Sequence, residues 1–131
     1  MKKTIIDSDK LSKPLGPYSH GVKVKLNGTT LLFLSGIVAF DANGKVVGKG
    51  DIRAQTRQVL ENLKGILELE GATFRDIVKI TNYYMNYEDY PVIAEVRSQY
   101  FGDWLPASTG VEVKRLIHKD LLIEIEAIAV L

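Results

Sequence analysis

Two glutamates near the C-terminal end of the chain have the residue type and the spacing for proton-transfer chemistry. Glu124 and Glu126 alternate with apolar residues in "IEIEAIAVL". Successive side chains of a strand point to opposite faces, so both carboxylates share one face with Leu122, Ile128 and Val130. At a solvated sheet edge they would be ordinary surface charges. In a partly apolar cleft, burial would raise the pKa of such a carboxyl group and let it move protons near neutral pH.

The turn "GPYSHG" and the end of a buried strand offer further polar groups. Tyr18 could present its hydroxyl to a ligand, or its ring could pack the turn onto the core. Ser35 and Gly36 end an apolar run, where sites often lie, but no Gly-x-Ser-x-Gly motif of a serine hydrolase surrounds them. His20 has no second histidine nearby, because His118 is far away in the sequence. We therefore expect no metal site.

Composition limits the class of protein. The 131 residues include 17 basic and 16 acidic side chains, a net charge of +1, whereas proteins that bind nucleic acid electrostatically usually carry a basic excess. There are no cysteines, which excludes disulfides and thiolate nucleophiles. The start "MKKTIIDSDK" lacks the apolar run of a signal peptide, and no window approaches eighteen apolar residues. We expect one cytoplasmic domain, residues 1–131, without a membrane partner.

Hydrophobic periodicity locates five strands and two helices. Asn27-Gly28 predicts a β-hairpin whose second arm, Leu31 to Leu34, is apolar on both faces. Asp51 is typical of a helix N-cap, and Gly71 of the stop that follows. The apolar stripe between them consists of Ile52, Val59, Leu60, Leu63, Ile66 and Leu67.

The second half of the chain alternates in the same way. "FRDIVKITNYYM" predicts a strand, and a helix then runs from Pro91 to Gly102. Val92, Ile93, Val96 and Tyr100 form its apolar side, and two strands follow, roughly Thr109 to Lys114 and Leu121 to Leu131. The segment "TNYYMNYEDY" contains four tyrosines, Tyr83, Tyr84, Tyr87 and Tyr90. No basic residue is interleaved with them, so a role in the core or at an interface is favoured over stacking on nucleic-acid bases.

These elements predict an α+β two-layer domain in which both helices cover one face of one sheet. The last strand is apolar on both faces, with Ile123, Ile125, Ala127 and Ala129 opposite the glutamate face. Both helices are needed on the first face, so no helix remains to cover the second face of the sheet. We therefore expect that face to pack against its own kind in a homo-oligomer.

As an ordered set, the segments resemble the Rid family, the reactive intermediate deaminases also known as RidA/YjgF or L-PSP endoribonucleases. The resemblance covers nearly the whole chain from Lys13 onward. It rests on "GPYSHG", "LSG", "QTRQVLENLKGIL", "DIVKITNYY", "VEVKRL" and "IEIEAIAV".

The resemblance implies a chorismate-mutase-like fold, with a six-stranded mixed sheet and two helices on one face. It also implies a homotrimer whose sheets form a central barrel, with three ligand clefts at the subunit interfaces and no cofactor. Family members hydrolyse enamines and imines to keto acids and ammonia. By the same resemblance, Glu124 would orient water or move protons and Tyr18 would close over the ligand. Ser35 and Gly36 would line the cleft.

The stretch "PASTGVEV" departs from the family pattern. Catalytic members carry an arginine that grips the substrate carboxylate, and Ser108 stands at its position, followed by Thr109 and Gly110. A hydroxyl cannot replace a planar, permanently charged fork, and losing such a contact costs about ten- to a hundred-fold in binding. Arg97, where the family usually has tyrosine, could restore the charge, although an arginine on a short helix more often faces solvent.

The resemblance and this departure lead to a first interpretation and two alternatives. The first is hydrolysis of a small enamine or imine metabolite other than the usual 2-imino acids. Glu124 and Tyr18 are then the catalytic residues, and the substrate-binding residues are Ser35, Gly36, Ser108, Thr109 and Gly110. One alternative is a trimer that binds a small molecule without turnover. The other is RNA cleavage or translation inhibition, which the near-neutral charge disfavours.

Overall fold

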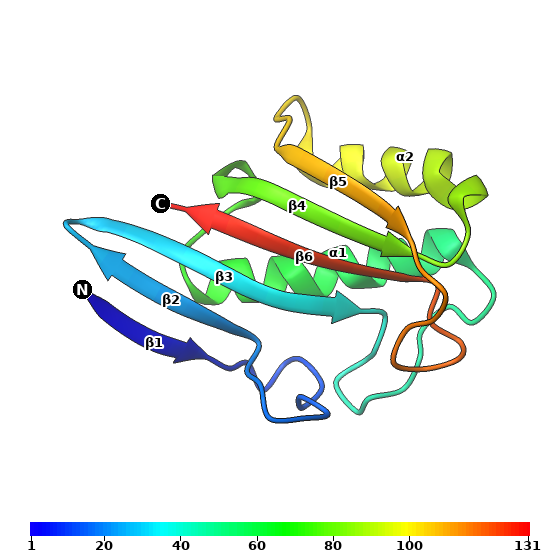
Figure 1. Ribbon diagram of the computed structural model, residues 1–131, viewed down its shortest axis with the longest axis horizontal. Coiled ribbons are helices and arrows are strands. Elements are labelled where there is room, and N and C mark those ends of the chain that lie inside the picture. Colours follow the sequence, from blue (N-terminus) through cyan, green and yellow to red (C-terminus); the bar gives the residue numbers. More distant parts are fainter.

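One mixed six-stranded sheet runs through the protein. The computed structural model describes all 131 residues. The strand order is β1-β2-β3-β6-β4-β5, and every neighbouring pair is antiparallel except β4 and β5 (Figure 1). The strands are β1 (Lys2–Ile6), β2 (Gly21–Leu26), β3 (Thr29–Val38), β4 (Ile77–Tyr84), β5 (Ala107–Glu112) and β6 (Ile123–Val130).

The two helices, α1 (Ile52–Leu69) and α2 (Tyr90–Phe101), lie side by side behind the sheet in Figure 1. The alternating burial of β6 shows why they pack there. Ile123, Ile125 and Ala129 are fully or almost fully buried, whereas the residues between them are half-buried on the other face. The apolar stripe of α1 covers this row, and all of its members except the half-buried Ile52 are buried. The predicted α+β fold with both helices on one face is confirmed.

Both helices begin and end where the sequence indicates. The Asp51 side chain accepts a hydrogen bond from the backbone N–H of Ala54 at 3.0 Å. Gly71, just after α1, has a φ of +71°, a conformation that glycine adopts without strain. In α2, Pro91 lies in the first turn and Gly102 is the C-cap. Neither helix combines the length and the apolar character that a membrane span requires.

We expect Asp51→Ala to lower the melting temperature by about 3–5 °C. The substitution removes the N-cap acceptor of α1, which contributes about 1 kcal/mol to the free energy of unfolding. Asp51→Asn is the matched control, because its amide oxygen can still accept the Ala54 hydrogen bond. Thermal unfolding followed by circular dichroism measures both variants, and an unchanged midpoint for Asp51→Ala would contradict the capping role.

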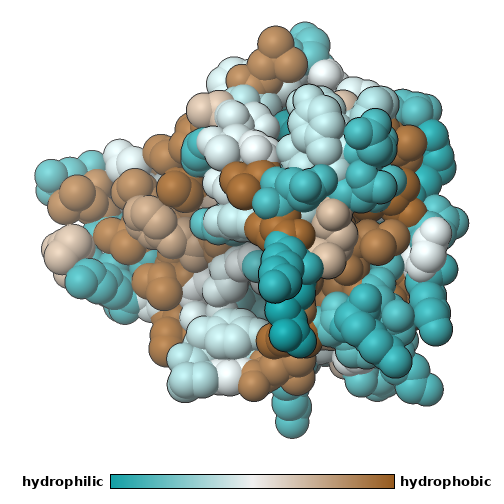
Figure 2. Space-filling view, turned by 45° about the vertical axis from the view of Figure 1, so that its right-hand side comes forward, coloured by the Kyte–Doolittle hydropathy of each residue, from teal (hydrophilic) through white to brown (hydrophobic).

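The sheet face turned to the viewer in Figure 1 carries no helix. Ile5, Phe33 and Val111 are 66%, 43% and 40% exposed on it, although each is apolar. Apolar side chains are interspersed with polar ones on the part of this face that Figure 2 shows. Within one chain, the second apolar face expected from β6 is therefore uncovered.

Candidate functional site

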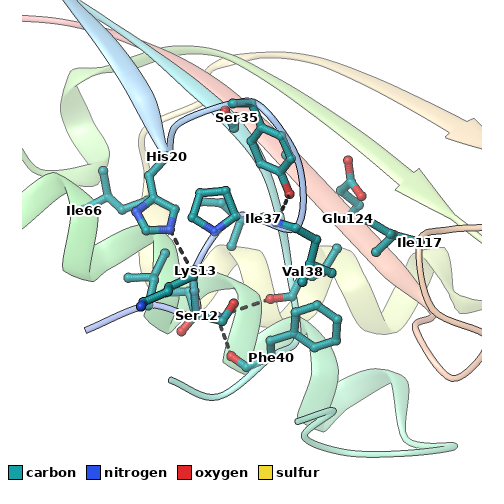
Figure 3. A pocket seen from close by; sticks show the side chains of 16 residues that line it. Ser12, Lys13, His20, Ser35, Ile37, Val38, Phe40, Ile66, Ile117 and Glu124 are labelled. Atoms are coloured by element: carbon teal, nitrogen blue, oxygen red, sulfur yellow. Dashed lines mark hydrogen bonds between the residues drawn. The ribbon is translucent and has the colours of Figure 1, made fainter. Parts of the chain in front are cut away.

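Four predicted site residues line one cavity of about 410 Å³: Tyr18, Ser35, Gly36 and Glu124. They come from the loop before β2, the end of β3 and the start of β6. Figure 3 shows Ser35, Ile37 and Glu124 around this cavity, with Val38 and Phe40 beside them. The wall is otherwise largely apolar. Together with α1 and Ile117, these segments enclose a mostly apolar hollow with one carboxyl group.

An irregularity in β3 brings glycine against this carboxyl group. The pairing of β3 with β6 shifts between Leu34 and Ile37, so Ser35 and Gly36 form a β-bulge. A Cβ atom placed on Gly36 would lie only 2.7 Å from the carboxyl carbon of Glu124. The Glu124 side chain therefore occupies the space that any side chain at position 36 would need.

Glu124 has the electrostatic environment of a proton-transfer group. Burial raises the pKa of its carboxyl group, and the negative charge of Glu126 raises it further. The carboxyl group makes no hydrogen bond with the rest of the chain, so both oxygens are available to a ligand. Of the two interpretations of the glutamates, the solvated sheet edge is wrong, because β6 lies between β3 and β4 at the centre of the sheet.

Glu126 differs from Glu124 in being held by a hydrogen bond. The hydroxyl of Tyr83 donates to Oε1 of Glu126 at 2.6 Å, and this bond raises the pKa of Tyr83. Both glutamates also border a shallower hollow of about 490 Å³, together with Arg115 and Ile117. Glu124 therefore lies between two hollows, while Glu126 influences it as a fixed neighbouring charge.

The loop before β2 is fastened by His20 and Ser35. Nδ1 of His20 accepts from the backbone N–H of Ser8, and Nε2 donates to the carbonyl of Ser12, both at 2.9 Å. The hydroxyl of Ser35 donates to the carbonyl of Ser19 at 2.6 Å. These anchoring roles were not predicted, because their only signal in the sequence is two polar residues beside a glycine-bounded turn.

Tyr18 lies at the exposed rim of the cavity. Its side chain is 51% exposed, and its hydroxyl accepts from the backbone N–H of Leu15 at 3.3 Å. The ring does not pack the loop onto the core, which was one of the two expectations. The phenol hydrogen remains free to be donated to a molecule in the cavity.

The other three predicted residues lie elsewhere, on the edge strand β5. Ser108 borders a separate hollow between β5 and α2. On the opposite face of the strand, the hydroxyl of Thr109 accepts from Nζ of Lys79 at 2.6 Å. Gly110 faces the ring of Tyr84, whose hydroxyl lies 2.7 Å from the place of a Cβ on the glycine. Strand β4 lies between β5 and β6, so within one chain none of the three lines a hollow at Glu124.

The tyrosine cluster divides between the two faces of the sheet. Tyr83 points to the open face, towards Glu126, whereas Tyr84 is buried on the helix side. Tyr87 and Tyr90 stack with ring centroids 6.1 Å apart, and both rings contact Tyr84. No three histidine or acidic side chains gather as metal ligands would.

Comparisons with known proteins place this geometry in a family. A family model described as "Endoribonuclease L-PSP" matches residues 9–131. The solved structure of YyfA from Yersinia pestis, described as a member of the conserved Rid protein family, superposes with a TM-score of 0.86 at 35% identity, over 98% of each chain. The chain belongs to the Rid family. This Rid protein has the chorismate-mutase-like fold that the resemblance implied.

Two named relatives are similar in sequence to this Rid protein along almost its whole length. A RutC family protein of Pyrococcus abyssi is 45% identical to this Rid protein over 129 residues, 98% of each chain. The 3-aminoacrylate deaminase RutC of Acinetobacter baylyi is 37% identical over 129 residues, again 98% of each. The relatives therefore align along almost the full length of this Rid protein.

Proposed function

We propose that this Rid protein hydrolyses a small enamine or imine metabolite to a carbonyl compound and ammonia. The observation that carries the proposal is the Glu124 carboxyl group, which has a raised pKa and no hydrogen-bond partner in the wall of a cavity of about 410 Å³. A cavity of this size suits a small metabolite. The deaminase name of the Acinetobacter relative supports the same reaction class.

Glu124 acts as base and then as acid. An enamine first becomes an imine by gaining a proton at carbon and losing one at nitrogen. The ionised carboxylate takes a proton from water as the water oxygen adds to the imine carbon, and it then gives this proton to the imine nitrogen. The resulting carbinolamine expels ammonia when the nitrogen is protonated again and the hydroxyl loses its proton. A carboxyl group whose pKa is raised towards neutrality can serve in both directions.

Tyr18 and the bulge of β3 orient the substrate. The Tyr18 hydroxyl can donate a hydrogen bond into the cavity from its rim, and Ser35 holds the loop that carries it. Gly36 leaves the space that the Glu124 carboxylate occupies. The apolar side chains of Ile37 and Val38 form part of the cavity wall and limit the access of water there.

The proposed active assembly is a homotrimer. The open sheet face carries Ile5, Phe33 and Val111, which are exposed in one chain and would be covered by packing of sheet against sheet. The position of Ser108, Thr109 and Gly110 on an edge strand would let them contribute to a cleft from a neighbouring subunit. Sedimentation equilibrium of the full chain tests the trimer, and a stable monomer would contradict it.

Two other functions are less well supported. Binding without turnover is favoured by Ser108, which lacks the charge of an arginine. RNA cleavage is disfavoured because His20, the only histidine in the cavity wall, uses both ring nitrogens in hydrogen bonds. Supplying 2-aminoacrylate, 3-aminoacrylate and an uncharged enamine, and measuring ammonia and carbonyl product, separates turnover from binding. A ligand recovered unchanged from a protein that accelerates none of these reactions would support the binding alternative.

Glu126→Gln is expected to move the acidic limb of the activity profile to lower pH. The glutamine oxygen can still accept from Tyr83, but the negative charge that raises the pKa of Glu124 is gone. The limb should move to lower pH but stay above its position for an ordinary glutamate, because burial still raises the pKa of Glu124. The profile of kcat/KM against pH measures the shift, with Glu68→Gln on the exposed side of α1 as control. An unmoved limb would exclude Glu124 as the titrating base.

A further inference from the structure

Arg97 on α2 is a cation without a counter-charge. Its side chain is half-buried, and its Nε atom is buried with no hydrogen-bond partner. No ion pair of the structure includes it, whereas Arg53 and Arg75 are both paired with carboxylates. Arg97 is therefore only partly exposed to solvent. A half-buried guanidinium with an unpartnered Nε–H and no neighbouring carboxylate is a good candidate to hold an anion.

The surroundings of Arg97 form a second hollow. A cavity of about 290 Å³ lies between α2 and the start of β5, and both Arg97 and Ser108 line it. Burial lowers the pKa of the Arg97 guanidinium. Tyr90, which also borders this cavity, offsets only part of this effect. The remaining lining is mainly apolar: Ala94, Phe101, Trp104, Leu105 and Pro106.

Ser108 is prepared as a hydrogen-bond donor in this cavity. The amide of Asn82, which is fully buried, donates to Oγ of Ser108 at 3.3 Å and to the carbonyl of Thr109 at 3.0 Å. The Ser108 oxygen thus accepts from Asn82, while its own hydrogen is donated to no group of the chain. Ser108 can therefore donate to an anion that faces Arg97.

We propose that Arg97, together with Ser108 and Tyr90, binds the carboxylate of a small organic acid in the hollow between α2 and β5. A planar guanidinium matches a carboxylate through two parallel hydrogen bonds. The apolar lining suits the carbon chain of the acid. A phosphate dianion fits less well, because the hollow offers one cation and few donors.

This site is separate from the Glu124 cleft within one chain, and its test needs no turnover. Isothermal titration of the full-length protein with sodium propionate at constant ionic strength measures binding, with propionamide as the uncharged isostere. We expect saturable binding of propionate and none of propionamide. In a ¹⁵N spectrum of arginine side chains, the Nε–H signal of Arg97 should shift with propionate concentration.

Variants assign the binding to Arg97. Arg97→Met should weaken propionate binding by about ten- to a hundred-fold, and Ser108→Ala by a smaller factor. Arg57→Met on the exposed side of α1 is the matched control, since Arg57 donates to Gln99 at 3.1 Å and does not line the hollow. Propionate affinity that is unchanged in Arg97→Met, or tighter binding of inorganic phosphate than of propionate, would overturn the proposal.

A folding failure of Arg97→Met leaves two decisive measurements. Arg97→Lys keeps the charge but lacks the planar fork, and we expect it to bind propionate more weakly than the wild type does. An Arg97 Nε–H signal that does not respond to propionate in the wild-type protein would overturn the site without any variant. Neither result depends on whether an enamine is hydrolysed, so this proposal and the proposed activity can fail separately.

Discussion

Replacing Glu124 by glutamine is expected to lower kcat/KM for an enamine substrate by roughly a hundred- to ten-thousand-fold. Glutamine fills the same space beside Gly36 and can still accept a hydrogen bond, but it cannot take a proton from water or return one to nitrogen. Ammonia release under steady-state conditions measures the loss. Glu68→Gln on α1 serves as the control and should keep the wild-type rate.

The same substitution should stabilise the protein, and only above acidic pH. The pKa of Glu124 in the folded protein is raised above the ordinary value of 4.5. Below that value the carboxyl group is protonated in both the folded and the unfolded state. The favourable contribution of the neutral group to the free energy of unfolding is then fully present. As the pH rises through the folded-state pKa the contribution is lost, because the ionised group is held in a desolvated place beside Glu126.

We therefore expect the melting temperature of Glu124→Gln to exceed that of the wild type by a few degrees at pH 8 and to equal it at pH 4. Differential scanning calorimetry at the two pH values checks this. A variant that is less stable than the wild type at pH 8 would show that the carboxylate contributes to the fold rather than being costly to it.

Gly36→Ala should remove most of the activity with little loss of stability. The added Cβ would lie 2.7 Å from the carboxyl carbon of Glu124 and 3.1 Å from its Cγ, so the glutamate side chain must leave its place. Gly36 does not have a positive φ, so alanine there introduces no backbone strain. We expect kcat/KM to fall by about a hundred-fold, since a displaced base loses its alignment with the substrate.

The matched control for this substitution is Gly65→Ala on α1. There the added Cβ would meet only Leu11, at an ordinary 3.8 Å. Its rate should equal that of the wild type, and its melting temperature should be equal or higher, because alanine favours the helix. Wild-type turnover by Gly36→Ala would contradict the contact between Gly36 and Glu124 as the feature that positions the base.

Local patterns predicted most elements because each carries its own signal. Helix α1 has a cap at Asp51, a stripe with helical spacing and a glycine stop, and the structure contains all three. Strand β6 alternates strictly, and its buried row is the predicted one. Strand β1 had no such signal: four of its five residues are exposed, so "KKTII" shows no apolar face, and its place depends on pairing with β2.

The site was harder to predict, because its residues meet through long-range pairing. The alternation of Glu124 and Glu126 allowed a sheet edge or a cleft, and only the position of β6 between β3 and β4 decides between them. The place of Arg97 depends likewise on β5 lying across from α2, since a helical pattern alone favours solvent for an arginine. Tyr18, Ser35 and Gly36 were candidates as residues of a turn and a strand end, but only the resemblance joined them to Glu124 in one cleft. The structure places all three around one cavity with Glu124.

Hydrolysis of a small enamine or imine in the Glu124 cleft can be tested directly. The most direct measurement is ammonia and carbonyl product released from freshly generated 2-aminoacrylate, 3-aminoacrylate and an uncharged enamine, with the wild-type protein and Glu124→Gln side by side. We predict that the wild type accelerates hydrolysis of at least one of them over the buffer rate and that Glu124→Gln does not. No acceleration of any of them by the wild type, or equal acceleration by Glu124→Gln, would contradict the claim.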